Sequence, residues 1–142
     1  MALGTFLQLI RPQSIEERRA QRLYRANAQR IVSRVRAVFD AWVALREDEP
    51  DYARLANANA VNRWELMRLV EDAEQLQPTR ALVGNRRELL NAVVGSARAC
   101  QLLANGYRSH KSEAVCDGQA LFLETVHDLE QLLLEVPDVD AR

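Results

Sequence analysis

An apolar stripe that runs from Ser14 to about Arg46 constrains the fold of this chain more than any other feature of its sequence. Apolar residues recur along it at alternating steps of four and three, which places them on one face of an α-helix. Ser14 and Glu17 have the spacing of a capping box, in which each side chain satisfies a backbone N–H of the first turn. The pattern therefore predicts one long amphipathic helix. Its stripe consists of Tyr24, Ala28, Ile31, Val35, Val38, Trp42 and Leu45.

A second amphipathic segment follows the acidic turn at residues 47–51 and ends before Pro78. Negative charge just before a helix favours its start. Two positions of its apolar seam are polar, Asn59 and Asn62, and asparagine side chains compete with the helix for backbone hydrogen bonds. We expect a helix here, either continuous or broken near residues 58–62.

The third and fourth segments have the same helical period. Asn85, with a glutamate three residues later, repeats the capping signature and predicts the start of the third helix. Gly106 is a typical C-terminal stop for it. The fourth helix ends near Glu135 and starts at Ser112 or at Asp117, and the glycine that follows Asp117 favours the later start.

The composition agrees with a helical chain. The 142 residues are 48% apolar and include only five glycines and four prolines, which favours helices over strands. Four amphipathic helices with short connections predict an all-α fold, an up-down-up-down four-helix bundle. We expect the bundle at residues 14–136, with a short apolar N-terminal arm at 1–13 and an acidic tail at 137–142. Because the first helix is the longest, its first two turns should overhang the bundle.

The net charge of −1 hides four segments of alternating sign. Residues 11–46 carry nine arginines against three acidic residues, and residues 47–78 carry three against eight. Residues 79–112 carry six basic residues against one acidic residue, and residues 113–142 carry one against eight. Alternating signs favour the pairing of sequence neighbours in an antiparallel bundle, although each exposed ion pair contributes at most about 1 kcal/mol.

The bundle topology predicts an arginine-rich end. The start of the first helix and the start of the third lie at the same end, so six arginines would approach one another there, with Arg11 beside them. Such a cluster is typical of a nucleic-acid or acidic-protein site. Acidic residues of the second helix and the tail reach the same end and can neutralise it, and no aromatic residues are interleaved for base stacking. The six arginines are Arg18, Arg19, Arg22, Arg80, Arg86 and Arg87.

The polar seam of the second helix faces a seam of small residues in the third. This combination predicts either a ligand cavity or a packed polar contact that fixes the register of the helices. A small-molecule sensor is therefore one alternative function. The residues that would line the cavity are Trp42, Asn59, Asn62, Ala97 and Cys100.

A short apolar stripe before the first helix is formed by Leu3, Phe6, Leu7 and Ile10. A helix this short is not stable in water by itself, so the stripe must pack on another surface. A membrane surface is disfavoured because the polar side of the stripe has no lysine or arginine. The arm can fold back along its own bundle, or it can pack on a second copy of the chain, where it would also cover the overhang. We expect the second arrangement and therefore predict a homodimer.

Two patterns that resemble reactive sites are better explained as surface structure. Glu124 and His127 have the ExxH spacing of carboxylate-bridged metal sites, but their helical phase points them toward solvent. His110 lies in a basic loop without a second catalytic partner, and that loop complements the charge of the acidic turn at residues 47–51. We therefore expect no metal, no cofactor and no catalytic site.

The cysteines and the apolar segments bear on the location of the protein. Cys100 and Cys116 lack CxxC spacing and are expected to be buried thiols in a reducing compartment. No basic residue precedes the N-terminal apolar segment and no apolar run reaches about 18 residues, so we expect a cytoplasmic protein without a membrane span. The leading interpretation is a non-catalytic helical-bundle interaction module that binds a protein partner or itself. The alternatives are a nucleic-acid-binding accessory protein and the small-molecule sensor.

Overall fold

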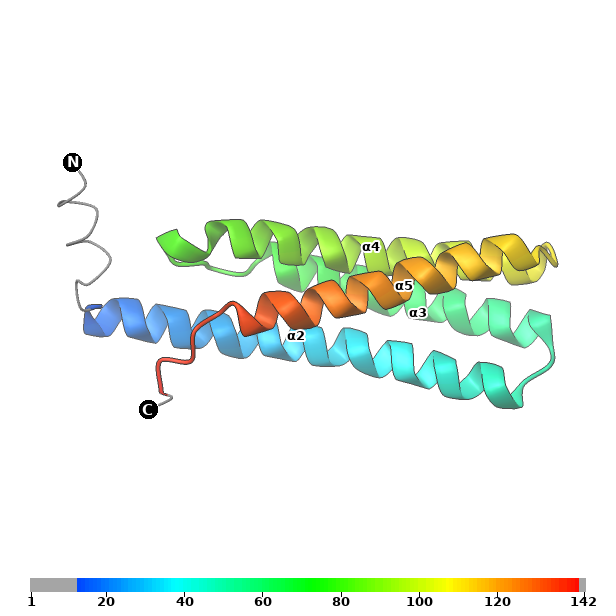
Figure 1. Ribbon diagram of the computed structural model, residues 1–142, viewed down its shortest axis with the longest axis horizontal. Helices are drawn as coiled ribbons and strands as arrows, with labels where there is room; N and C mark the ends of the chain where they lie inside the picture. Colours follow the sequence, from blue (N-terminus) through cyan, green and yellow to red (C-terminus); the bar gives the residue numbers. More distant parts are fainter. Residues whose placement is uncertain (1–12, 141–142) are drawn as a thin grey trace.

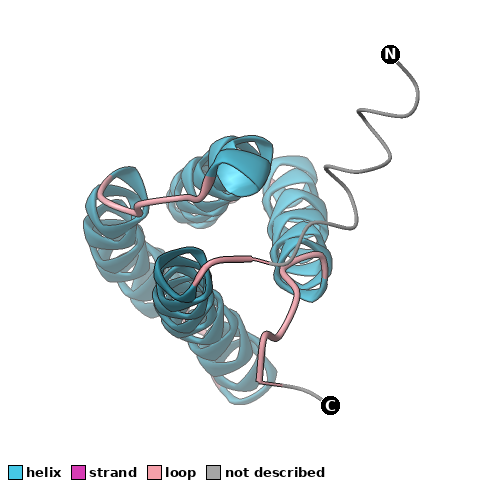
Figure 2. Cartoon of the chain, turned by 90° about the vertical axis from the view of Figure 1, so that its left-hand side faces the viewer, coloured by secondary structure: helices cyan, strands magenta, loops and turns pink. Residues whose placement is uncertain are grey.

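The computed structural model describes residues 13–140, which form four long α-helices and one short 3-10 helix, with no strand among them. The long helices run alternately up and down around one core (Figures 1 and 2). The predicted all-α, up-down-up-down four-helix bundle is confirmed. The elements are α2 at Ile15–Asp48, α3 at Tyr52–Glu74, η1 at Arg80–Leu82, α4 at Val83–Arg108 and α5 at Ser112–Leu134.

Helix α2 starts where the capping pattern predicts. The Oγ atom of Ser14 accepts a hydrogen bond from the backbone N–H of Glu17 at 3.1 Å, which satisfies a donor that has no partner within the first turn. The predicted stripe faces the core from Tyr24 to Trp42. The start and the buried face of this helix are therefore determined locally, although the helix continues to Asp48, slightly beyond the predicted end.

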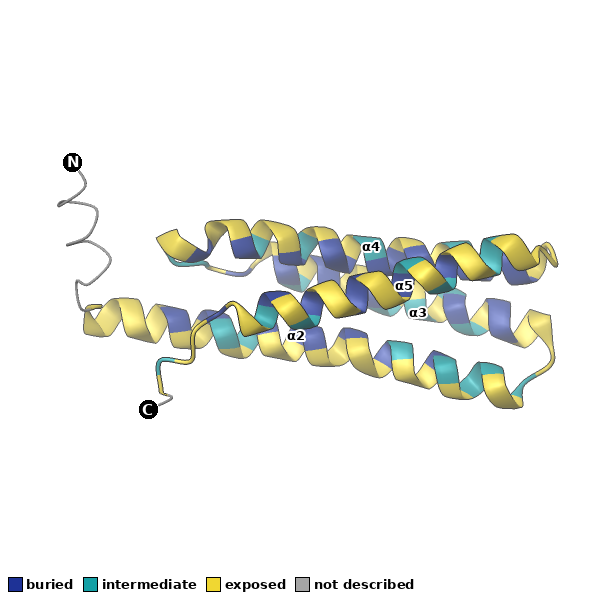
Figure 3. Cartoon of the chain, viewed as in Figure 1, coloured by how far each residue is buried: buried dark blue, intermediate teal, exposed yellow. Residues whose placement is uncertain are grey.

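The first turns of α2 extend beyond the other helices, as predicted (Figures 1 and 3). Every residue from 15 to 20 is exposed, and Gln21 is the first buried residue of the helix. The segment that follows α5 packs here, because Gln21 Nε2 donates a hydrogen bond to Pro137 O at 3.1 Å. These first turns, residues 15–23, are called the overhang.

Helix α4 starts differently from the prediction, because Asn85 does not cap it. The helix begins at Val83 directly after η1. The buried side chain of Asn85 instead bridges two other helices. Its Oδ1 accepts a hydrogen bond from the hydroxyl of Tyr24 at 2.7 Å, and its Nδ2 donates to Leu132 O at 2.8 Å. The prediction of an N-cap at Asn85 is wrong because a buried amide takes partners across the core.

Two glycines mark a close approach between α4 and α5. Helix α4 continues past Gly106, so the predicted stop is wrong, and α5 begins at Ser112, the earlier of the two predicted starts. A Cβ atom added at Gly106 would lie 2.9 Å from Val115 N, and one added at Gly118 would lie 3.1 Å from Ala99 O. Both glycines are therefore needed where one backbone lies against another.

Helix α3 is continuous through residues 58–62, so the alternative of a break there does not occur. Asn59 is fully buried, and its Nδ2 donates a hydrogen bond to Leu55 O of the same helix at 2.9 Å. This bond satisfies one N–H of the amide without interrupting the helix.

Helix α4 is the most closely packed element of the bundle. It approaches α3 and α5 closely along most of its length, whereas α2 stands farther from its two neighbours, α3 and α5. The difference follows from side-chain size. Buried residues of α4 include Ser96, Ala97 and Ala99, which let backbones meet, while the core face of α2 carries Tyr24 and Trp42.

The glycine at the α4–α5 contact provides a test of this packing. Gly118→Ala should lower the free energy of unfolding by about 1–3 kcal/mol, because its Cβ would also lie 2.9 Å from Leu103 Cγ and would force the helices apart. Gly84→Ala is the matched control, since a Cβ there meets nothing within 4 Å and alanine favours a helix by up to about 1 kcal/mol. Urea unfolding measures both variants. Equal effects would contradict the observed α4–α5 contact.

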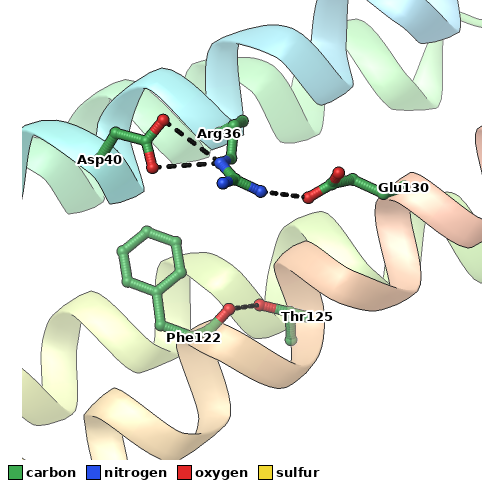
Figure 4. A network of polar contacts seen from close by, with 5 residues as sticks. All are labelled: Arg36, Asp40, Phe122, Thr125 and Glu130. Atoms are coloured by element: carbon green, nitrogen blue, oxygen red, sulfur yellow. Dashed lines mark hydrogen bonds and ion pairs between the residues drawn. The ribbon is translucent and has the colours of Figure 1, made fainter. Parts of the chain in front are cut away.

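Ion pairs between helices join α2 to both of its neighbours. Arg36 binds Asp40 of its own helix at 3.1 Å and Glu130 of α5 at 2.6 Å, and these carboxylates raise the pKa of its guanidinium (Figure 4). Arg30 pairs with Asp72, and Arg34 with Glu65, both of α3. The predicted pairing of oppositely charged neighbours is therefore observed for α2. No basic residue of α4 forms an ion pair with the described residues.

Candidate functional site

The six predicted arginines lie toward one end of the bundle, where α2 and α4 begin (Figure 1), whereas Arg11 lies outside the described residues. These two helices occupy opposite corners of the bundle (Figure 2). Arg22 forms a bidentate pair with Asp140, with distances of 2.8 and 3.0 Å. Arg86 donates to Glu74 O at 2.6 Å. The four others, Arg18, Arg19, Arg80 and Arg87, are exposed and form no ion pair within residues 13–140.

The residues predicted to line a ligand cavity come from α2, α3 and α4. Trp42, Asn59, Ala97 and Cys100 are buried in the core, and Asn62 is half-buried. Within the described residues, two buried polar atoms of this set have no hydrogen-bond partner, Trp42 Nε1 and Asn59 Oδ1. Burial raises the pKa of the Tyr107 hydroxyl. The indole N–H of Trp42 acts in the opposite direction and lowers this pKa, although the N–H itself forms no hydrogen bond. The cavity stays a prediction.

An aromatic cluster holds Trp42 in place. Its ring stacks on Phe122 with centroids 6.1 Å apart, and Phe39 meets both rings edge-on at 6.0 and 5.1 Å. Arg46 lies over the indole at 4.9 Å, where the positive charge faces the ring. The indole is thus enclosed by packing on several sides.

The two cysteines differ in environment. Cys100 is buried, and this burial raises the pKa of its thiol to about 12, so the reactive thiolate is suppressed at neutral pH. Cys116 is exposed, which makes the prediction of two buried thiols wrong for this residue. Cys116 lies on the outer side of α5 because the helix begins at Ser112, which places this residue away from the buried Phe122 and Leu129.

The patterns that resemble reactive sites lie on the surface. Glu124 and His127 are exposed, as their helical phase predicts. Within residues 13–140, no group of three or more histidine, cysteine, aspartate and glutamate side chains is arranged to hold a metal ion. His110 stacks on Tyr52 with centroids 5.2 Å apart, and Tyr52 meets Tyr107 edge-on at 5.1 Å. The contact at this loop is therefore aromatic.

The outer face of α3 carries three large apolar residues at successive steps of three. Val61 is 66% exposed, Trp64 is 73% exposed and Met67 is 41% exposed. Residues three apart are neighbours on a helix surface, so these side chains form one patch, which we call the α3 patch. Arg63 and Arg68 flank it, are exposed and form no ion pair among the described residues. The patch combines residue types that are enriched at protein interfaces.

A hollow of about 540 Å³ lies between α4 and α5, and we call it the α4/α5 groove. Its apolar lining is formed by Ala92, Gly95, Leu121 and Leu132. Its charged lining consists of Glu88, Asp128 and Glu135, with the amides Asn91 and Gln131 and the hydroxyl of Thr125. The hydroxyl is already engaged, since it lies 2.7 Å from Ser96 Oγ and donates to Phe122 O at 3.0 Å (Figure 4).

Neither of these surfaces was among the predicted sites. A signal for the α3 patch is present in the sequence, because Val61, Trp64 and Met67 fall outside the Leu66 and Leu69 seam. The α4/α5 groove has no comparable signal. Its carboxylates come from two helices, and their proximity depends on the register between them.

The predicted arm residues Leu3, Phe6, Leu7 and Ile10 lie outside the described residues. Within residues 13–140, no helix combines the length and apolar character that a bilayer crossing requires. The chain matches no protein-family model, and comparisons with curated proteins and with solved structures find no significant similarity.

Proposed function

We propose that this protein is a non-catalytic interaction module whose α3 patch binds a protein partner. The observation that supports the proposal is the exposure of Val61, Trp64 and Met67 in one row on α3. Exposed apolar residues are common singly, but a contiguous group with a tryptophan at its centre is typical of a binding surface.

The charge around the α3 patch indicates what kind of partner it suits. Arg63 and Arg68 are exposed beside Trp64 and have no acidic partner among the described residues. A complementary surface would present an apolar centre with acidic residues at its rim. Tryptophan and arginine also carry a large share of the binding energy in many protein interfaces. The protein partner is therefore expected to be apolar and acidic.

Trp64→Ala provides the direct test. Because the side chain is exposed, the substitution should change the free energy of unfolding by less than about 0.5 kcal/mol. It should nevertheless weaken binding to a captured protein partner by about thirtyfold or more, since a central aromatic anchor contributes about 2 kcal/mol or more. Capture from native lysate with and without nuclease, followed by titration of the purified partner, measures this effect.

Leu123→Ala is the matched control, because Leu123 is a similarly exposed apolar residue on α5. It should bind as the unchanged protein does. Undiminished binding by the Trp64 variant would contradict the proposal. Capture that nuclease abolishes would favour the nucleic-acid alternative, which uses Arg18, Arg19 and the other predicted arginines.

The proposal includes a cytoplasmic location and self-association. The location is supported by Cys100 and Cys116, which are both free thiols. Self-association is supported by a second pair of surfaces, the overhang and the α4/α5 groove, whose chemistry is complementary.

A further inference from the structure

We propose that the α4/α5 groove of one copy of this chain receives the overhang of a second copy, giving a twofold homodimer with two such contacts. The inference rests on the proposed interaction function and deepens it by naming a second copy of the chain as one partner. It assigns a binding role to carboxylates and arginines that form no ion pair within residues 13–140.

The groove selects for an occupant that is both apolar and positively charged. Glu88, Asp128 and Glu135 line it, and no lysine or arginine does. None of these three carboxylates forms an ion pair within residues 13–140. The apolar lining includes Leu132 between Asp128 and Glu135 on the α5 side, and the half-buried Leu121 at the other end of that wall. A ligand with apolar side chains and cations at its edges would satisfy both components.

The outer side of the overhang has the complementary composition, while Glu16 and Glu17 also lie in its first turn. Ile15 is 78% exposed and Leu23 is 59% exposed, and Arg19 lies midway between them. Steps of four place these three side chains in one row, on the side of α2 opposite the core residue Tyr24. Arg18 is adjacent, and neither Arg18 nor Arg19 forms an ion pair with the described residues. Within residues 13–140, the row is a cationic, partly apolar helix surface without a partner.

The wall of the groove is longer than the row that it would receive. At about 1.5 Å per residue, the row from Ile15 to Leu23 extends about 12 Å, and the α5 wall of the groove from Leu121 to Glu135 extends about 21 Å. A helix of two to three turns can therefore lie along that wall.

The arrangement of the helices allows a closed dimer with twofold symmetry. The start of α4 and the end of α5 lie at the end of the bundle from which α2 projects (Figure 1). Glu88 lies in the second turn of α4 and Glu135 directly follows α5, so both belong to this end of the groove. A twofold axis near this end would direct each overhang toward the other copy's groove. Each copy then contributes one overhang and one groove, so the assembly ends at two copies.

Charge reversal on each surface tests the inference. One full-length variant carries Arg18→Glu and Arg19→Glu, and a second carries Asp128→Arg and Glu135→Arg. Each variant alone should raise the dimer dissociation constant about tenfold or more, because like charges then face each other in both contacts. An equimolar mixture should recover dimer, since the reversed overhang matches the reversed groove and the two unchanged surfaces match each other. Sedimentation and light scattering measure these states.

The matched control carries Glu113→Arg and Asp117→Arg, the same charge change on α5 outside the groove, and should dimerise normally. Circular dichroism establishes that every variant is folded. A full-length protein that is monomeric at high micromolar concentration would overturn the inference, as would a dimer that resists both reversals or a mixture that does not recover. Partner capture by the charge variants is measured separately and should be unchanged. The result for dimerisation through the α4/α5 groove is therefore independent of the result for partner binding by the α3 patch.

Discussion

Replacing Leu129 by alanine is expected to lower the free energy of unfolding by about 2–5 kcal/mol. Leu129 is completely buried on α5, in the core that all four helices enclose. The substitution removes apolar contacts and leaves a cavity, because neighbouring helices relax only in part. Urea or thermal unfolding at neutral pH measures the loss.

Glu124→Ala is the companion measurement, because Glu124 lies on the exposed side of the same helix. Its free energy of unfolding should change by less than about 0.5 kcal/mol. Comparable losses for the two variants would mean that the orientation of α5 is different from the one described. That outcome would also reopen the question of a metal site at Glu124 and His127.

Asn85→Ala is expected to lower the free energy of unfolding by about 2–5 kcal/mol. The substitution removes both hydrogen bonds of the amide, and so deprives the Tyr24 hydroxyl and Leu132 O of these partners inside the bundle. Each buried polar group left without a partner costs about 1–3 kcal/mol. Burial raises the pKa of Tyr24 to about 12, so its hydroxyl stays protonated near neutral pH. Chemical denaturation gives the free energy.

A double-mutant cycle with Tyr24→Phe separates this role from that of a helix cap. If the two side chains share a hydrogen bond, the double variant should lose less stability than the sum of the two single variants. A cap at Asn85 would instead be worth about 1 kcal/mol and would be independent of Tyr24. Asn105→Ala, at an exposed position of the same helix, should have little effect. Additive losses would contradict the Asn85 bridge.

The sequence by itself determined features that depend on neighbours along the chain. The start of α2 follows from Ser14 and Glu17, which meet within one turn. The buried face of α2 follows from periodicity, because side chains three and four residues apart lie on one side of a helix. The exposure of Glu124 and His127 follows from the same rule. The overhang follows from helix length alone.

Only the tertiary structure decided the features that depend on contacts between helices. Asn85 has the sequence context of a cap, yet its amide binds Tyr24 and Leu132 because the core brings both within reach. Gly106 resembles a helix stop, yet it is the point where α5 lies against α4. The α4/α5 groove depends on the same interhelical register. A periodic pattern specifies which side of each helix is buried, but the pairing of polar and small residues across helices is set by how all four pack together.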